Sequence, residues 1–328
     1  APGPGLLHPS PALQNGTDDR KWEHLENMSK RTSARRDLAA PVVHVASGRD
    51  LPDPHTPGMN APADCGVVFL HRPAPPSLRP FYTELATYEE TGGFTIRQIE
   101  TASLAIPLII SFGTPFRIRL GQTPIAGDEQ PSFIAGLDTA RIFIASSGRA
   151  ACLQVNLTPV GAQRLLGIPA SEFAGRMVPL ADLAHPQISE LRRRLEDTDD
   201  WNARLDCAEG FLAAGFGAAA AEPSRPLVDI AFGLIASGGV HRIDDLAARI
   251  GWSRKHLADR FSRAFGLSPK TVARIARFNR AQALARAAKR PDWADIASAG
   301  GYSDQAHMIR EFEEFAGLSP RAWWLSLD

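Results

Sequence analysis

Cysteine is scarce in this chain of 328 residues, and long apolar runs are missing. The three cysteines, Cys65, Cys152 and Cys207, are far apart and odd in number, which excludes a disulfide framework and a Cys-x-x-Cys metal site. No apolar run reaches the roughly 18–20 residues that cross a bilayer, and the first residues lack the form of a secretory signal. We therefore expect reduced thiols, no membrane partner and a cytoplasmic location.

Aromatic residues are nearly missing from the first 80 positions. This segment holds 13 of the 26 prolines but only two of the 25 aromatic residues, Trp22 and Phe69. A composition of this kind buries too little apolar surface to offset the conformational entropy lost on folding. Residues 1–80 are therefore predicted to be a largely disordered, proline-rich segment, and order is expected to begin near Phe81.

Histidine is absent between Phe81 and Ala184. A metal-using β-barrel enzyme needs clustered histidine and carboxylate ligands, so this stretch predicts no metal site. The sequence also has no Gly-x-Ser-x-Gly elbow, no phosphate-binding loop and no dinucleotide fingerprint. We predict a protein that is not an enzyme, with no catalytic residue and no cofactor.

The net charge of zero conceals an uneven distribution. Residues 223–328 contain 16 basic and 11 acidic residues, and residues 253–290 contain 11 basic residues and a single acidic one, Asp259. A concentrated positive stretch is the electrostatic pattern that a phosphate backbone attracts. The last third of the chain is therefore the candidate for nucleic-acid binding.

Short β-rich runs dominate the middle of the chain, and Gly, Pro and Asp separate them. This pattern predicts a small β-barrel or sandwich, followed by helices over 158–166, 188–195 and 201–221. The linker composition of 222–226 places a domain boundary there, which gives a domain over 81–222. The expected strands are 94–99, 105–112, 116–120, 140–145 and 151–157.

A degenerate repeat fills the last part of the chain. The segment 243–253 recurs as 293–303, at an offset of 50 residues, with Gly251 and Trp252 matched by Gly301 and Tyr302. The offset then becomes 51, because Gly-Leu-Ser-Pro ends at Pro269 in one copy and at Pro320 in the other. Each copy is typical of two helices around a tight turn, and one residue has been added after the second turn. We predict helix-turn-helix motifs over about 243–265 and 293–315.

The second helix of each copy has an apolar back and a polar front, as a helix in a DNA major groove requires. Between the copies, Ser268 and Pro269 are a good helix start, and a helix to about Lys289 would be about 30 Å long. That length is close to the ~34 Å of one DNA turn. The predicted fold is therefore α+β, with an all-α domain over 223–328 in which a long helix joins two helix-turn-helix subdomains.

Residues 237–327 resemble the DNA-binding domain of the AraC family of bacterial transcription regulators. The second copy carries that family's signature, from Asp295-Ile-Ala through Tyr302 and Arg310-Glu-Phe to Gly317-Leu-Ser-Pro320. The resemblance implies a sequence-specific, double-stranded-DNA-binding regulator of transcription initiation, located on the nucleoid when bound.

The resemblance also implies roles for individual residues. Base edges would be reached by Lys255, Ala258 and Asp259 in the first copy and by Gln305, Ala306, Ile309 and Arg310 in the second. Asp259 has two alternative roles: it accepts a hydrogen bond from cytosine, or it pairs with Arg263. The DNA-binding set is Ser253, Arg254, Lys255, Asp259, Arg263, Ser303, Gln305, Ala306, His307, Ile309 and Arg310. The structural core of the reading helices is Leu246, Leu257, Phe261, Ile296, Met308 and Phe312.

Residues 81–222 are similar to the cupin-like sensory domains that precede many AraC-type DNA-binding domains. The similarity lies in the segments Pro107–Gly113 and Asn156–Gly167. It implies a domain that binds a small-molecule effector. Two alternatives remain open for this domain: formation of a homodimer, or contact with the transcription machinery such as RNA polymerase. A non-specific architectural DNA-binding protein is a further alternative for the whole chain.

Overall fold

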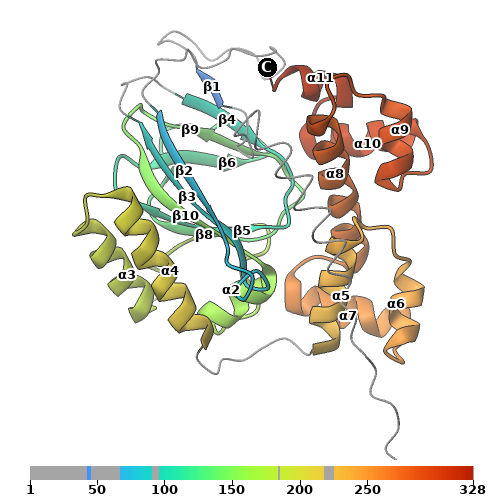
Figure 1. Ribbon diagram of the computed structural model, residues 1–328, viewed down its shortest axis with the longest axis horizontal. Coiled ribbons are helices and arrows are strands. Elements are labelled where there is room, and N and C mark those ends of the chain that lie inside the picture. The colour runs from blue at the N-terminus through green and yellow to red at the C-terminus, as the bar shows by residue number, and fades with distance from the viewer. Residues whose placement is uncertain (1–42, 46–66, 91–95, 184, 218–224, 328) are drawn as a thin grey trace, which may run out of the picture. The chain divides into compact units, whose positions relative to one another are not determined.

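The structure is a computed structural model that describes residues 43–45, 67–90, 96–183, 185–217 and 225–327. A β-rich N-terminal region is followed by a helical C-terminal region, which confirms the α+β prediction (Figure 1).

Two antiparallel sheets form the β-rich region. One has five strands in the order β1-β4-β9-β6-β7, and the other has six in the order β11-β8-β5-β10-β3-β2. The strands of the first sheet are β1 (Val43–Val45), β4 (Ile96–Glu100), β9 (Ile142–Ala145), β6 (Phe116–Leu120) and β7 (Glu129–Gln130). Those of the second are β11 (Met177–Pro179), β8 (Phe133–Ala135), β5 (Ile106–Ser111), β10 (Ala151–Leu157), β3 (Tyr82–Glu90) and β2 (Val67–Pro73).

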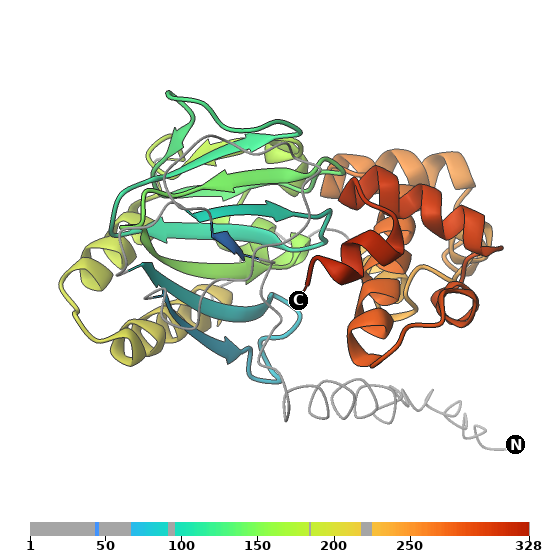
Figure 2. The same cartoon turned by 90° about the horizontal axis from the view of Figure 1, so that it is seen from above.

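Strand alternation gives the six-stranded sheet two different faces. On β10, Cys152 faces the five-stranded sheet, in a small apolar cluster with Ile109 and Ile118. The neighbouring Leu153 and Val155 point the other way, into a larger core that includes residues of three helices. These helices are α2 (Pro159–Leu166), α3 (Pro186–Glu196) and α4 (Trp201–Gly217). Figure 2 shows α3 and α4 beside the blue strands β2 and β3.

Local signals in the sequence account for these helices. Thr158 caps α2 by accepting a hydrogen bond from the N–H of Gly161, and Pro159 occupies the first turn, where its missing N–H costs nothing. On α4, Leu205, Leu212 and Phe216 are buried at helical spacing. The apolar side of the helix therefore packs against the six-stranded sheet.

The helical region begins with α5 (Arg225–Ala236) and contains seven α-helices among the described residues. Arg225 and Pro226, which the sequence assigns to a linker, belong to α5, because proline is well accommodated in the first turn of a helix. The rest of the expected boundary, 222–224, lies outside the described residues. The other six helices are α6 (Ile243–Arg249), α7 (Arg254–Phe265), α8 (Pro269–Ala287), α9 (Trp293–Gly300), α10 (Gln305–Ala316) and α11 (Pro320–Leu325).

The expectation of disorder up to residue 80 is too broad. Strand β2 lies within that segment and pairs along its length with β3, from Val67 opposite Glu90 to Pro73 opposite Glu84. The average over 80 residues conceals the apolar run Val67-Val68-Phe69-Leu70, which has the composition of a strand. Residues 1–42 and 46–66 lie outside the described part of the chain, as do 94–95 and 218–221 at the ends of two predicted elements.

Candidate nucleic-acid interface

Helices α6 and α7 form the first helix-turn-helix, here called the first reader. The turn between them passes through Gly251, whose φ of +68° is a left-handed conformation that favours glycine. Ser253 then caps α7, because its hydroxyl accepts a hydrogen bond of 3.2 Å from the N–H of His256. Gly251 and Ser253 thus form the tight turn between two helices that the repeat predicts.

Helices α9 and α10 form the second reader, and here the cap has moved by one residue. Gly301 has a φ of +82°, like its counterpart Gly251. The residue that caps α10 is Asp304, not Ser303: its Oδ1 accepts from the N–H of His307 at 2.7 Å. Ser303, the sequence counterpart of Ser253, donates instead to Asp304 Oδ2 at 3.1 Å. The added residue found in the repeat is thus accommodated just before α10.

Two hydrogen bonds stabilise the charged form of Asp304. The N–H of His307 is the main one and the hydroxyl of Ser303 is the second, and together they lower the pKa of this carboxyl group. Asp304 is not among the DNA-binding or core residues that the sequence predicts. The change of offset from 50 to 51 between the two copies was the signal for it.

The backs of the two readers are buried. On α7, Leu257, Phe261 and Phe265 lie in one apolar core, and on α10, Met308, Phe312 and Phe315 lie in a second. Each core also takes side chains from the long helix α8. All six residues expected in the core of the reading helices are buried: Leu246, Leu257, Phe261, Ile296, Met308 and Phe312.

The fronts of α7 and α10, which we call the reading helices, are exposed. Three of the proposed contact residues are only half-buried: Ala258 on α7, and His307 and Ile309 on α10. The exposed members are Ser253, Arg254, Lys255, Asp259 and Arg263 of the first reader and Ser303, Gln305, Ala306 and Arg310 of the second. The structure thus brings each set together on the face opposite its apolar core.

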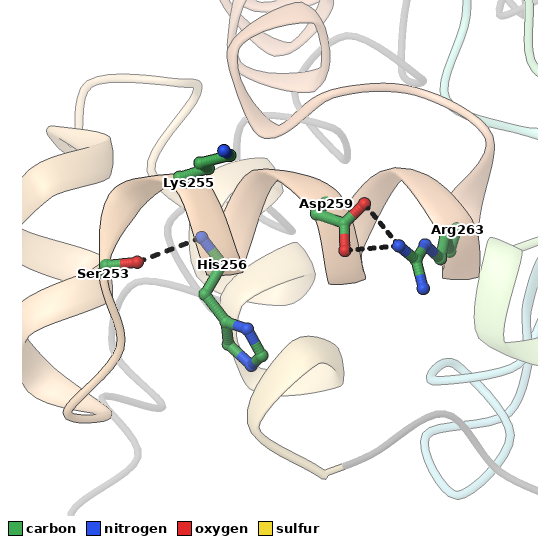
Figure 3. A pocket seen from close by; sticks show the side chains of 5 residues that line it. All are labelled: Ser253, Lys255, His256, Asp259 and Arg263. Carbon is green, nitrogen blue, oxygen red and sulfur yellow. Dashed lines mark hydrogen bonds and ion pairs between the residues drawn. The ribbon is translucent and has the colours of Figure 1, made fainter.

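An ion pair occupies the middle of the first reading helix. Arg263 Nη2 lies 2.8 Å from Asp259 Oδ2, and the two side chains point toward each other from successive turns (Figure 3). This contact corresponds to one of the two roles left open for Asp259. The same side chains, with Ser253, Lys255 and His256, line an open hollow of about 400 Å³ on the surface of α7.

One histidine of each reading helix contacts a neighbouring aromatic ring. The rings of His256 and Trp252 meet edge to face with their centres 4.6 Å apart, and those of His307 and Tyr302 do so at 5.2 Å. The ring of His307 also lies 3.2 Å from the hydroxyl of Ser303, through Nδ1. These contacts fix both rings in place at the edge of the exposed face.

The positive stretch of the sequence is not one continuous basic surface. Arg274 and Arg277, on α8, are turned toward α10, where both bind the buried carboxylate of Glu311. Both charges belong to the positive stretch from which nucleic-acid binding is predicted. Their acidic partner lies more than thirty residues further along the chain, so local sequence did not reveal the pairing.

Within the described residues, no group of three or more His, Cys, Asp or Glu side chains is arranged to hold a metal ion. In the same part of the chain, no helix has the length and apolar character of a membrane span.

Comparison with known families bears directly on the two readers. Residues 246–324 match a family model described as a helix-turn-helix domain. The match spans both readers, so this region contains a helix-turn-helix domain. The comparison with curated proteins gives no match.

Three solved structures are similar to parts of this chain. The C-terminal domain of AraT, a response regulator from Geobacillus stearothermophilus, is 19% identical over 32% of this chain and 87% of that one, with a TM-score of 0.30. ToxT from Vibrio cholerae with a bound unsaturated fatty acid is 11% identical over 79% of this chain and 95% of that one, with a TM-score of 0.42. The AraC-like transcriptional activator CuxR is 14% identical over 71% of this chain and 91% of that one, with a TM-score of 0.19.

Proposed function

We propose that this protein is a sequence-specific transcription regulator whose two readers enter adjacent major-groove segments of one DNA duplex. The observation that carries the proposal is the pair of exposed polar fronts, on α7 and α10, supported by one shared helix. Helix α8 has 19 residues, so it is about 28 Å long. That length suits two recognition elements about one helical turn apart.

The proposal assigns separate tasks to the exposed side chains. Arg310 makes a bidentate pair with guanine and Gln305 pairs with adenine, because their terminal groups match those base edges. Arg254 and Arg263 grip phosphates, which gives affinity without sequence preference. The second reader therefore carries more of the sequence discrimination than the first, in which Ala258 has no hydrogen-bonding group.

Selection of binding sites from a random duplex pool tests the proposal. The full chain is expected to enrich a motif of two elements with centres about 10 base pairs apart. The variant with Gln305→Ala and Arg310→Ala serves as the matched control and should lose one element and keep the other. Failure of the wild-type protein to enrich any sequence contradicts the proposal and favours an architectural role. Footprinting across the genome then relates the sites to promoters.

A second proposal concerns the β-rich region, which we infer binds a small-molecule effector between its two sheets. A row of polar side chains follows the inner face of the six-stranded sheet. Asn156 Nδ2 donates to Glu84 Oε1 at 2.8 Å, and His71 Nδ1 lies 3.3 Å from Glu84 Oε2. Gln154 donates to Asn156 at 2.7 Å and continues the row. Hydrogen-bonding groups beside an apolar interior are typical of ligand sites.

Thermal unfolding of the full chain in the presence of a metabolite library tests the second proposal. A compound that binds only the native state raises the melting temperature, and the rise grows with the logarithm of its concentration above Kd. Asn156→Ala and Glu84→Gln should each abolish that rise. If no compound raises the temperature and the protein is a homodimer at micromolar concentration, the region acts as a dimerisation module instead.

A further inference from the structure

Three arginines occupy every third position on one side of α8. Arg274, Arg277 and Arg280 are separated by three residues each, a spacing that aligns side chains along one helix face. Arg280 Nη1 donates to the carbonyl oxygen of Ser237 at 3.2 Å, in the turn that follows α5. Arg274 Nε donates to Glu311 Oε1 at 2.8 Å, on the second reading helix. Arg274 thus binds the second reading helix, and Arg280 binds the turn after α5.

The middle arginine binds both partners at once. Arg277 Nη1 donates to the carbonyl oxygen of Gly239 at 3.1 Å, and Nη2 donates to Glu311 Oε1 at 3.3 Å. Its guanidinium also lies 5.8 Å from the centre of the Tyr302 ring, in the turn of the second reader. Its side chain is only 16% exposed. A single planar group therefore joins the turn after α5 to the second reading helix.

Helix α5, which leads into the turn, belongs to the core of the first reader. Leu227, Ile230 and Leu234 of α5 share a cluster with Leu257 and Phe261 of α7. Helix α5 is therefore packed against the first reading helix. A contact to the carbonyl of Gly239 is in effect a contact to the first reader.

The turn after α5 packs so closely on α8 that no side chain fits at Gly239. Gly239 has a φ of +74°, and a Cβ atom placed on it would lie 1.9 Å from the carbonyl oxygen of Ala273. A Cβ atom on Gly301, in the turn of the second reader, would lie 2.8 Å from Val240 Cγ2. The backbone of the turn therefore sits directly on α8 and beside the second reader. This close approach brings the carbonyl of Gly239 within reach of Arg277.

We call the contacts of Arg277 with Gly239 and Glu311 the joint. Burial of the carboxylate of Glu311 in this joint costs free energy. Its side chain is 3% exposed, and burying a carboxylate is unfavourable unless cations and hydrogen bonds compensate. Arg274 and Arg277 provide that compensation. Buried ion pairs of this kind seldom stabilise a fold more than apolar residues of the same volume, and their best-attested role is to specify geometry.

We propose that Arg277 is a positioning residue that holds the two reading helices at one separation and so sets the base-pair spacing the protein accepts. Arg277 contacts no base in this account. It acts through Gly239 on one side and through Glu311 on the other. The inference rests on the proposed function, because spacing has meaning only if both readers bind one duplex.

The test uses the full chain and the two-element site obtained by selection. Duplexes in which the spacing is changed by one or two base pairs are titrated with wild-type protein and with Arg277→Lys. Lysine keeps the charge but has no planar fork to hold two acceptors. One base pair moves an element by about 3.4 Å and rotates it by about 35°, so a rigid wild-type protein should lose about tenfold in affinity. Arg277→Lys should lose less than about threefold and keep the same base preferences.

Arg280→Lys is the matched control, because it makes the same chemical change on the same face of α8. Arg280 binds the turn after α5 and not the second reading helix. The control variant should keep the wild-type spacing profile. Glu311→Gln opens the joint from the other side and should flatten the profile as Arg277→Lys does. It also carries the test if Arg277→Lys does not fold, which thermal unfolding determines.

The possible results separate the two proposals. If the wild-type protein selects a two-element site and both joint variants keep its sharp spacing profile, the positioning role of Arg277 is wrong and the proposed function stands. An equal loss of affinity at every spacing means a merely structural role and also overturns the inference. If the wild-type protein selects no sequence, the proposed function and the positioning role fail together.

Discussion

Asp259 is the only acidic residue of α7, and the proposed function implies that it opposes DNA binding at the first reader. Its carboxylate repels phosphate and holds Arg263, yet both side chains are largely exposed, at 49% and 73%, so the pair adds little stability. Asp259→Asn should raise affinity for any duplex several-fold and steepen the salt dependence by about 0.9 in log–log slope for each extra phosphate neutralised. Fluorescence titration at several salt concentrations measures both effects. Asp229→Asn, which removes the same charge from α5, should change neither quantity.

Arg310 has the side chain best suited to read a base in the second reader. It is exposed on α10, two residues before the buried Phe312. Arg310→Ala should relax preference at one or two base pairs, a loss of about 1–3 kcal/mol of discrimination. Arg263→Ala should weaken binding to all sequences alike. Binding-site selection with each variant distinguishes these results, and an unchanged motif with Arg310→Ala would mean that Arg310 grips phosphate.

Glu100 makes the stability of the β-rich region depend on pH. It lies on β4 on the inner side of the five-stranded sheet, and burial raises its pKa from 4.5 to about 7. Between these pH values the folded protein keeps a proton that the unfolded chain has released. Stability therefore falls as pH rises from about 4.5 to 7, by up to about 1.4 kcal/mol per pH unit for this one group.

Glu100→Gln should remove this contribution. The variant keeps an oxygen to accept from Gln98 Nε2, which lies 3.3 Å from Glu100 Oε1 in the wild-type protein. Denaturant unfolding at pH 5 and pH 8 should find the variant more stable than wild type at pH 8, with a smaller difference at pH 5. A difference that does not change with pH would rule out a raised pKa at this site.

Helix α10 is capped by Asp304, one residue after Ser303, which the repeat pattern aligns with the cap of α7. Asp304→Ala removes the acceptor for the N–H of His307 and should destabilise the domain by about 1 kcal/mol. Ser303→Ala should cost less, because Ser303 makes no bond to the backbone of α10. Thermal unfolding of both variants gives the comparison. A larger loss with Ser303→Ala than with Asp304→Ala would place the cap at Ser303 instead.

The strands and helices that sequence predicts well have strong local signals. The ranges 116–120 and 151–157 match β6 and β10, since each alternates apolar with polar residues and is bounded by turn residues. Strand β3 is not predicted because Tyr82–Glu90 contains three glutamates, a residue that is depleted in strands. Two of its carboxylates have distant partners: Glu89 accepts from the Trp201 indole at 2.6 Å and Glu90 from the N–H of Ala150 at 2.9 Å. Local composition cannot reveal these partners.

The reading helices were predictable for the same reason. The apolar backs of α7 and α10 repeat every three or four residues, and glycine and serine mark the turns. The partners of the α8 arginines were not predictable, because Arg274 and Arg277 meet Glu311 only after the chain has folded back through α9. Sequence therefore identifies which residues are charged but not which charges remain available to DNA.

For the whole molecule, the charges that remain exposed set the strength of the response to salt. Exposed basic residues of the helical region include Arg254, Lys255, Arg260 and Lys270. If about five phosphates are neutralised, log affinity of the full chain should fall against log salt with a slope of roughly −4 to −5. Lys255→Ala should reduce the magnitude by about 0.9. A slope near zero would mean that the basic face does not meet DNA.

Helix α8 also limits how this protein can be re-engineered. Val272 and Ala273 belong to the core of the first reader, whereas Ile275 and Phe278 belong to the core of the second. The two sets follow one another along the helix, so a cut between Ala273 and Ile275 separates the two apolar cores. The same cut leaves Arg277 with the second reader and removes its native partner, the carbonyl of Gly239. A chimera joined there therefore sets Arg277 against a foreign turn. Exchange of the whole unit from Arg225 onward, or of only the exposed side chains of α7 and α10, avoids this break.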